Sequence, residues 1–111
     1  MEVAKEILRQ LGGRRFALMT GAKDFCSKEG ANWLEFKIGR NASKANFVKI
    51  TLTAMDDYTM EFYRVSWPRW NPKKAEFTEY KKTLIKKKDG IYFDMLQEVF
   101  TEVTELYTRL F

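Results

Sequence analysis

The sequence predicts a single α+β domain spanning residues 1–111. In this domain an antiparallel sheet of four to five strands carries an N-terminal helix and a long C-terminal amphipathic helix on one face. Two observations support this fold class. Apolar and polar residues alternate in the middle of the chain, whereas apolar residues recur at three- and four-residue steps at both ends. At 111 residues, 45% of them hydrophobic, the chain is long enough to form one core without disulfides or metal.

The N-terminal segment is expected to form a helix over residues 2–11. Its apolar residues follow helical spacing and are Val3, Ala4, Ile7, Leu8 and Leu11. Gly12 and Gly13 then end the helix, because glycine readily adopts a positive φ. Residues 14–20 are predicted as the first strand, and residues 21–24 as a turn.

The middle of the chain contains the three clearest strands. Residues 32–38 alternate so that Leu34, Phe36 and Ile38 are predicted to point inward. Residues 47–54 alternate in the same way, with Val48, Ile50 and Leu52 against Lys49, Thr51 and Thr53. Asp56 and Asp57 then predict a hairpin turn that leads into a strand over residues 58–65, with Tyr58, Met60 and Phe62 on one face.

The last third of the chain is predicted as a broken loop, an edge strand and a helix. Pro68 and Pro72 interrupt the region after residue 65. Residues 80–87 are the candidate for a fifth strand, which their lysines would confine to an edge of the sheet. Asp89 and Gly90 open the final helix, whose apolar residues recur over five turns as far as Leu110.

The composition excludes several kinds of catalytic site. The chain has no histidine, so it lacks the usual general base, zinc ligand and triad member. Cys26 is the only cysteine, which excludes an internal disulfide and a thiolate metal cage. We therefore expect no enzyme, no cofactor and no metal. One weaker alternative is a Mg²⁺-dependent nuclease, because Asp24, Glu35 and Lys37 are similar to the two acids and lysine of such enzymes.

The charge is unevenly distributed. The net charge is +5, but residues 64–88 hold nine Lys and Arg against Glu76 and Glu79, whereas residues 89–111 hold Arg109 against five acidic residues. A basic segment of this density attracts phosphate backbones, anionic lipid headgroups or an acidic protein face, and charge alone does not choose among them. No apolar stretch approaches the roughly twenty residues of a membrane span, and no secretory signal is visible. We expect a cytoplasmic protein without a membrane partner.

Several strings resemble a group of uncharacterised small proteins encoded by bacterial phages, plasmids and related mobile elements. They are Leu11-Gly12-Gly13 with Phe16, Met19-Thr20-Gly21-Ala22-Lys23, Val48-Lys49-Ile50-Thr51-Leu52, Met60-Glu61-Phe62, Asp94-Met95-Leu96-Gln97 and Phe100-Thr101-Glu102. The resemblance covers most of the chain in a consistent order but omits residues 67–79. It implies a mobile-element origin, a cytoplasmic setting and a small binding protein, and it supplies no reaction and no site residues.

Two groups of residues are candidates for binding. The first is the aromatic and basic segment Trp67, Pro68, Arg69, Trp70, Asn71, Pro72, Lys73 and Lys74, which continues to Phe77 and Tyr80. Exposed rings there would stack on unpaired bases while the cations neutralise phosphates, unless a tryptophan folds back onto the sheet. The second is a basic face made of Lys81, Lys82, Lys86, Lys87 and Lys88 with Lys37, Arg40, Lys44 and Lys49, provided that their strands are neighbours.

These candidates leave two functions open. The favoured one is nucleic-acid binding, with single strands preferred because stacking needs exposed bases. The alternative is an effector or inhibitor that binds a host protein, such as a defence-system component, with Trp67, Arg69 and Trp70 as anchors. The acidic residues Glu98, Glu102 and Glu105 are predicted to form the ordinary polar face of the last helix. The alternatives are a surface for head-to-tail self-association and one that mimics nucleic acid toward a basic partner. The oligomeric state is left open.

Overall fold

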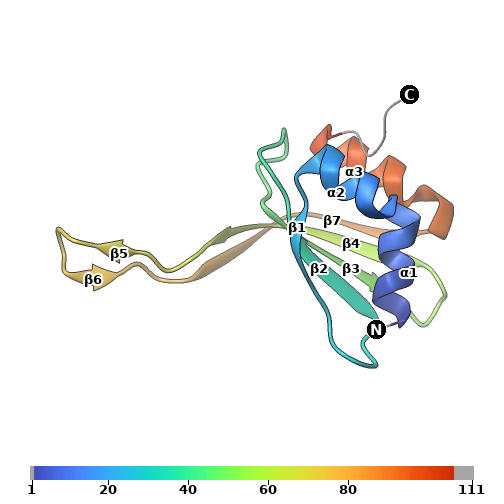
Figure 1. The fold of residues 1–111 in the computed structure, drawn as a ribbon, viewed down its shortest axis with the longest axis horizontal. Helices are drawn as coiled ribbons and strands as arrows, with labels where there is room; N and C mark the ends of the chain where they lie inside the picture. The colour runs from blue at the N-terminus through green and yellow to red at the C-terminus, as the bar shows by residue number, and fades with distance from the viewer. Residues whose placement is uncertain (1, 107–111) are drawn as a thin grey trace.

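The computed structural model of the chain describes residues 2–106 and has an α+β fold (Figure 1). Two helices precede a five-stranded antiparallel sheet, and a third helix follows it. The elements are α1 Glu2–Leu11, α2 Gly13–Thr20, β1 Lys23–Cys26, β2 Trp33–Lys37, β3 Phe47–Leu52, β4 Tyr58–Ser66, β5 Trp70–Asn71, β6 Glu76–Phe77, β7 Lys81–Ile91, the 3-10 helix η1 Phe93–Met95 and α3 Leu96–Thr104. The predicted fold class and N-terminal helix are confirmed.

The sheet has the order β1-β2-β3-β4-β7, and each strand pairs antiparallel with its neighbour. The helices lie together on one side of it (Figure 1). The opposite side, called here the outer face, is covered by no helix of the described residues. Because β1 and β7 are the two edges, the predicted edge position of the lysine-rich strand is confirmed.

The core forms between the sheet and the helices. The inward positions predicted for the middle strands are confirmed, since Phe36 and Phe62 are fully buried. Phe16 of α2 meets Phe36 at 5.5 Å and Phe100 of α3 at 5.0 Å, in each case edge to face. Each such ring contributes roughly 1.5–3 kcal/mol through its burial. The other fully buried apolar side chains include Ile7, Leu11, Val48, Ile50, Met60 and Leu96.

The predicted strand over residues 14–20 is wrong, because these residues form α2. The first helix ends at Leu11 as predicted, but a second helix begins at Gly13 (φ 61°), directly after Gly12 (φ 122°). Phe16 and Thr20, four residues apart, are the buried residues of α2, as expected for one face of a helix. Gly21 (φ 74°) ends the helix and donates its N–H to the Ala17 carbonyl at 3.0 Å. The first strand of the sheet is β1, which lies partly in the predicted turn.

The predicted start of the last helix at Asp89 and Gly90 is also wrong. β7 continues through both residues to the buried Ile91, and Gly90 (φ 65°) lies where the register with β4 shifts. This glycine forms a bulge within the strand instead of a turn before a helix. The helical region begins with η1, and α3 ends before Glu105 (φ 61°), whose N–H bonds to Thr101. The rest of the predicted helix, residues 107–111, lies outside the described residues.

β4 and β7 extend beyond the sheet as a two-stranded ribbon, and residues 67–80 at its end are called here the arm (Figure 1). Ser66 lies opposite Lys81 and Trp70 opposite Phe77, so one register runs the length of the ribbon. The Thr78 N–H donates to the Arg69 carbonyl at 2.7 Å between these paired stretches. The arm extends the molecule to 49 × 34 × 23 Å. Its radius of gyration is 15.0 Å, against about 13 Å for a compact domain of this length.

Candidate functional site

Four aromatic rings gather on the outer face at the base of the arm, and we call them the aromatic platform. Phe47 of β3 lies beside Tyr63 of β4 (6.5 Å between ring centroids) and Trp67 (6.3 Å). Trp67 in turn lies 5.7 Å from Tyr80, its neighbour across the arm. Trp67 is 42% exposed and Tyr80 53% exposed. The platform therefore presents two accessible rings supported by two half-buried ones.

Two lysines border the platform. The Lys37 ammonium lies 4.8 Å from the centre of the Trp67 ring, and it also pairs with Asp24 at 3.2 Å. The Lys82 ammonium lies 4.2 Å from the Tyr63 ring and 5.3 Å from the Phe47 ring. The negative faces of the rings attract these cations. Positive charge is thus held directly beside exposed ring surface.

The Tyr63 hydroxyl is held by a hydrogen bond to a neighbouring residue of the same strand. It donates a hydrogen bond to a Glu61 carboxylate oxygen at 2.6 Å. Burial and this hydrogen bond raise the pKa of Tyr63 to about 12, because both favour the neutral phenol over the phenolate. The phenol therefore keeps its proton to a higher pH than an exposed tyrosine does, and the ring lies under the Lys82 ammonium.

Farther from the arm, the outer face carries a row of charges that balance one another. Glu35 of β2 lies opposite Lys49 of β3. Lys49 lies opposite Glu61 of β4, and Glu61 lies opposite Lys87 of β7. Opposite charges on neighbouring strands stabilise a sheet. Lys49 and Lys87, although predicted as binding residues, therefore lie in a locally neutral row. Trp33 lies at the same end of the face, with the Lys49 ammonium 5.4 Å from its ring.

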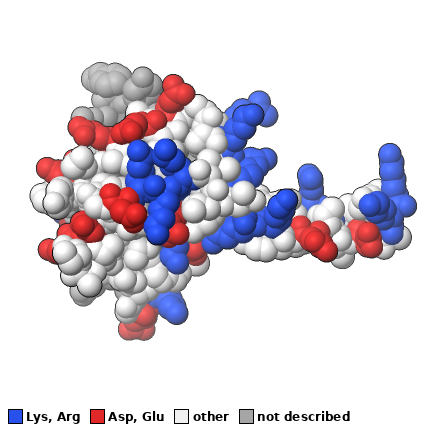
Figure 2. Space-filling view, turned by 180° about the vertical axis from the view of Figure 1, so that it is seen from behind, with Lys and Arg blue, Asp and Glu red and all other residues white. Residues whose placement is uncertain are grey.

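The arm carries the second aromatic pair of the predicted segment. Trp70 lies 5.3 Å from Phe77, and both rings are more than half exposed. Trp67 thus contacts the sheet through Phe47, whereas Trp70 belongs to the outer end of the arm. The arm cations Arg69, Lys73 and Lys74 are exposed, and Lys81 is exposed at the base of the arm, opposite Ser66. Figure 2 shows Lys and Arg atoms along the arm from its base to its tip.

The predicted basic residues do not lie on one face, because a bulge divides those of β7. Lys86 pairs with the inward Phe62, but the register shifts at the next step and Leu84 pairs with the outward Tyr63. Lys82 consequently lies on the outer face, whereas Lys86 and Lys88 lie on the helix side. There Lys88 pairs with Glu102 of α3 at 3.4 Å. Arg40 and Lys44 lie in the loop between β2 and β3, near Arg64.

Sequence reasoning missed two rings of the platform and one cation. Phe47 and Tyr63 occupy the solvent-facing positions of alternating strands, where polar residues are expected. Aromatic residues at such positions were the available signal. Arg64 was counted in the basic segment, but only the fold shows that it meets the β2–β3 loop.

The residues of the nuclease-like pattern have other contacts. Lys37 pairs with Asp24 and covers Trp67, and Glu35 lies in the balanced charge row. Within residues 2–106, no group of three or more Cys, Asp or Glu is arranged to hold a metal ion. In the same residues, no helix is long and apolar enough to cross a membrane.

Comparisons of the chain with protein-family models, with curated proteins and with solved structures found no significant match.

Proposed function

We propose that this protein binds single-stranded nucleic acid on the aromatic platform and along the arm, as a binding protein without catalytic activity. The observation that carries the proposal is the exposure of Trp67 and Tyr80 beside Lys37 and Lys82 on a sheet face that no described helix covers. The proposal agrees with the small mobile-element binding proteins that the sequence resembles. The affinity of the protein for a single strand comes from two sources, which are base stacking and charge.

Stacking accounts for the preference for single strands. A base laid on an exposed aromatic ring contributes about 1–3 kcal/mol, whatever its identity. In a duplex the faces of the bases are already covered by their neighbours, so the rings have nothing to stack on. Two accessible rings 5.7 Å apart, Trp67 and Tyr80, suit neighbouring unpaired bases. The preference follows from ring exposure and needs no sequence-specific hydrogen bonds.

The phosphates are bound by the lysines and arginines around these rings. Lys37 and Lys82 hold their ammonium groups over platform rings, and a flexible lysine stem lets each group move to a phosphate when a base takes its place. Farther out, Arg69, Lys73 and Lys74 of the arm are exposed. Each phosphate neutralised on a single strand releases counterions and adds about 0.7 to the slope of log affinity against log salt.

The test is fluorescence anisotropy of a labelled oligonucleotide, single-stranded or duplex, at low and at physiological salt. We expect Trp67→Ala to weaken single-strand binding about tenfold or more, because one stacked base is lost. Trp33→Ala is the matched control, since Trp33 lies on the same face beside Lys49 but in the balanced row. Equal losses in the two variants, or none in either, would contradict the proposal.

A charge variant separates the two sources of affinity. Lys82→Gln should weaken binding and reduce the salt slope by about 0.7, whereas Trp67→Ala should leave the slope unchanged. Lys5→Gln, on the exposed side of α1, removes the same charge far from the platform and should change neither. If the slope of log affinity against log salt falls equally for Lys82→Gln and Lys5→Gln, binding depends on the net charge of the protein and not on a lysine at the platform.

One observation favours a second candidate, the binding of a host protein. The pair Trp70 and Phe77 lies at the outer end of the arm, exposed and apart from the platform. Tryptophan and arginine are frequent anchors of protein interfaces, and Arg69 lies beside this pair in the chain. A pull-down from a bacterial lysate, compared between the wild type and Trp70→Ala, tests it. A partner retained equally by both proteins would exclude the tip as the anchor.

A further inference from the structure

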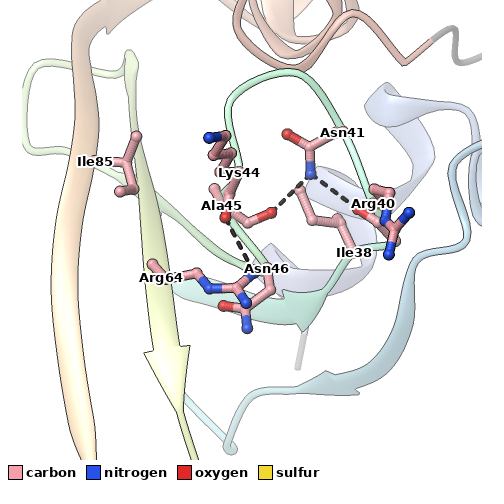
Figure 3. A pocket seen from close by; sticks show the side chains of 9 residues that line it. Ile38, Arg40, Asn41, Lys44, Ala45, Asn46, Arg64 and Ile85 are labelled. Atoms are coloured by element: carbon pink, nitrogen blue, oxygen red, sulfur yellow. Dashed lines mark hydrogen bonds between the residues drawn. The ribbon is translucent and has the colours of Figure 1, made fainter.

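A groove of about 730 Å³ opens on the helix side of the sheet, next to the base of the arm (Figure 3). It lies between the β2–β3 loop and the paired strands β4 and β7. The residues that line it include Ile38, Arg40, Lys44, Ala45, Arg64 and Ile85. Arg64 follows Tyr63 directly in β4, so the two side chains leave opposite faces of the sheet. The groove is therefore separate from the aromatic platform.

The groove is strongly cationic. Arg40, Lys44 and Arg64 contribute three positive charges, and no acidic residue is among the lining residues. Over residues 2–106, none of the three has a carboxylate oxygen within ion-pair distance. Such uncompensated charges attract an anion more strongly than lysines that face glutamates. Lys88, by comparison, is already paired with Glu102.

The loop that carries two of these cations is held in one conformation. The Asn41 side-chain amide donates to the carbonyls of Gly39 (2.8 Å) and Ala45 (2.7 Å), as Figure 3 shows. The Arg64 guanidinium donates to the Lys44 carbonyl at 3.3 Å. The Ala42 N–H donates to Thr104 at the end of α3. A groove fixed in advance loses little conformational entropy when it binds a ligand.

Asn46 fixes the other end of the loop to the sheet. Its side-chain oxygen accepts the Val65 N–H at 2.7 Å, and its side-chain amide donates to the Val65 carbonyl at 2.9 Å. These bonds continue the pairing of β4 beyond Phe47, the first residue of β3. They hold Arg64, the residue before Val65, against the loop.

The groove also has an apolar surface beside its cations. Ile38 and Ala45 are buried in the floor, and Ile85 is 42% exposed at the wall. Ile85 is the residue that the β7 bulge leaves unpaired, between Leu84 and Lys86. A ligand that suits the groove therefore combines an anionic group with a flat or apolar body. The volume lies within the roughly 300–1,000 Å³ of small-molecule sites.

We propose that this groove binds a nucleoside phosphate, with its phosphates on Arg40, Lys44 and Arg64 and its base against Ile38 and Ile85. The phosphates belong either to a free nucleotide or to a nucleotide of a bound strand. Guanidinium groups form paired hydrogen bonds with phosphate oxygens, which gives two arginines more specificity than two lysines would have. This site consists of groove residues alone and shares no residue with the aromatic platform.

The experiment titrates the intact protein with ATP, inorganic pyrophosphate and adenosine at constant ionic strength, and follows amide shifts by NMR and the melting temperature. ATP should shift the amides of residues 38–46 and raise the melting temperature, because a ligand that binds the folded state stabilises it. Pyrophosphate should bind more weakly and adenosine not at all. Arg40→Gln and Arg64→Gln should each reduce the affinity for ATP about tenfold or more.

Arg14→Gln is the matched control, because Arg14 is an exposed arginine of α2 outside the groove. Arg40 makes no side-chain hydrogen bond or ion pair among the described residues, so its replacement leaves the fold intact even if Arg64→Gln does not. Equal ATP affinity in the wild type and Arg40→Gln, or shifts spread over the whole surface, would overturn the proposal.

A competition measurement then identifies the source of the phosphate. ATP that displaces a labelled oligonucleotide places the groove on the path of the bound strand, and ATP that binds beside it makes the groove a separate nucleotide site. Both results support a nucleoside-phosphate site. If the protein binds the oligonucleotide through Trp67 and shows no ATP binding, the groove proposal fails and the function proposed above stands.

Discussion

Neighbouring residues of β4 serve different surfaces. Tyr63 supports the aromatic platform, and Arg64, one residue later, lines the cationic groove on the helix side. Val65 is then buried and held by Asn46. Because successive side chains of a strand alternate between faces, three consecutive residues contribute to a platform, a groove and a rigid support. The effects of replacing each one should therefore be separable.

Tyr63 gives a prediction at alkaline pH. Its phenol should lose its proton at a pKa of about 12 in the folded protein, whereas an exposed tyrosine titrates near 10. The folded state then holds this proton more tightly than the unfolded state does. The resulting stabilisation is complete below about pH 10 and is lost as the pH rises toward 12. Phenolate absorbance of the wild type, minus that of Tyr63→Phe, measures this pKa directly.

Glu61→Gln tests whether the hydrogen bond to Glu61 contributes to the raised pKa of Tyr63. It removes the charged acceptor of the hydrogen bond and leaves the burial of the ring unchanged, so the pKa of Tyr63 should fall but stay above 10. A Tyr63 phenol that titrates near 10 in the wild type would show that it is neither buried nor hydrogen-bonded to Glu61 as described.

The arm is an element that the core does not need. No residue of 67–80 is among the buried residues, and the pairing of Ser66 with Lys81 continues the sheet at its base. Replacing residues 67–80 with Asn-Gly should close the ribbon, because this dipeptide favours the tight turn of a two-residue hairpin. We expect the free energy of unfolding to change by about 1 kcal/mol or less. Single-strand binding should be lost with Trp67, Tyr80 and the arm cations.

Urea denaturation and anisotropy on the same sample measure the two effects. A protein that no longer folds would mean that the arm stabilises the sheet through the contact of Trp67 with Phe47 on the outer face. In that case Trp67→Ala and Trp70→Ala should differ in stability, because only Trp67 contacts the sheet. Full oligonucleotide affinity without the arm would contradict the proposed function.

The sequence predicts those elements whose period is regular. The strands at residues 33–37, 47–52 and 58–66 were predictable because one face of each is buried and the other solvated. α2 was not predictable, because it has only eight residues and buries only Phe16 and Thr20, a pattern too short to show a helical period. Asp89 and Gly90 are typical turn residues, but here they lie inside β7 because Gly90 supplies the positive φ of a bulge.

The sequence indicated which residues belong to the candidate site, but it did not indicate on which face of the sheet each of them lies. Trp67, Tyr80 and the lysines were identified from the sequence, whereas their division between faces was not. That division depends on the bulge at Ile85, a single unpaired residue that reverses the faces of all earlier positions in β7. Local sequence carries no clear signal for such a shift, since Leu84 and Ile85 are ordinary strand residues.

At the scale of the whole molecule, the arm projects from one end of the sheet and gives the protein an elongated shape (Figure 1). Small-angle X-ray scattering should give a radius of gyration near 15.0 Å for the wild type. For the variant with Asn-Gly in place of residues 67–80, it should fall to about 13 Å, the value of a compact domain. A wild-type value already near 13 Å would mean that the arm folds back onto the body in solution.

The unbroken register of the arm has a consequence for how its length can change. Since Ser66 faces Lys81, Trp70 faces Phe77 and Asn71 faces Glu76, residues can be removed or added in opposed pairs without moving any residue of the core. Each added pair extends the ribbon by roughly 3.3 Å. Insertion of one residue in one strand alone would instead move the side chains beyond it to the opposite face of the ribbon. The length of the arm is therefore a property that evolution or design can adjust in this protein independently of its stability.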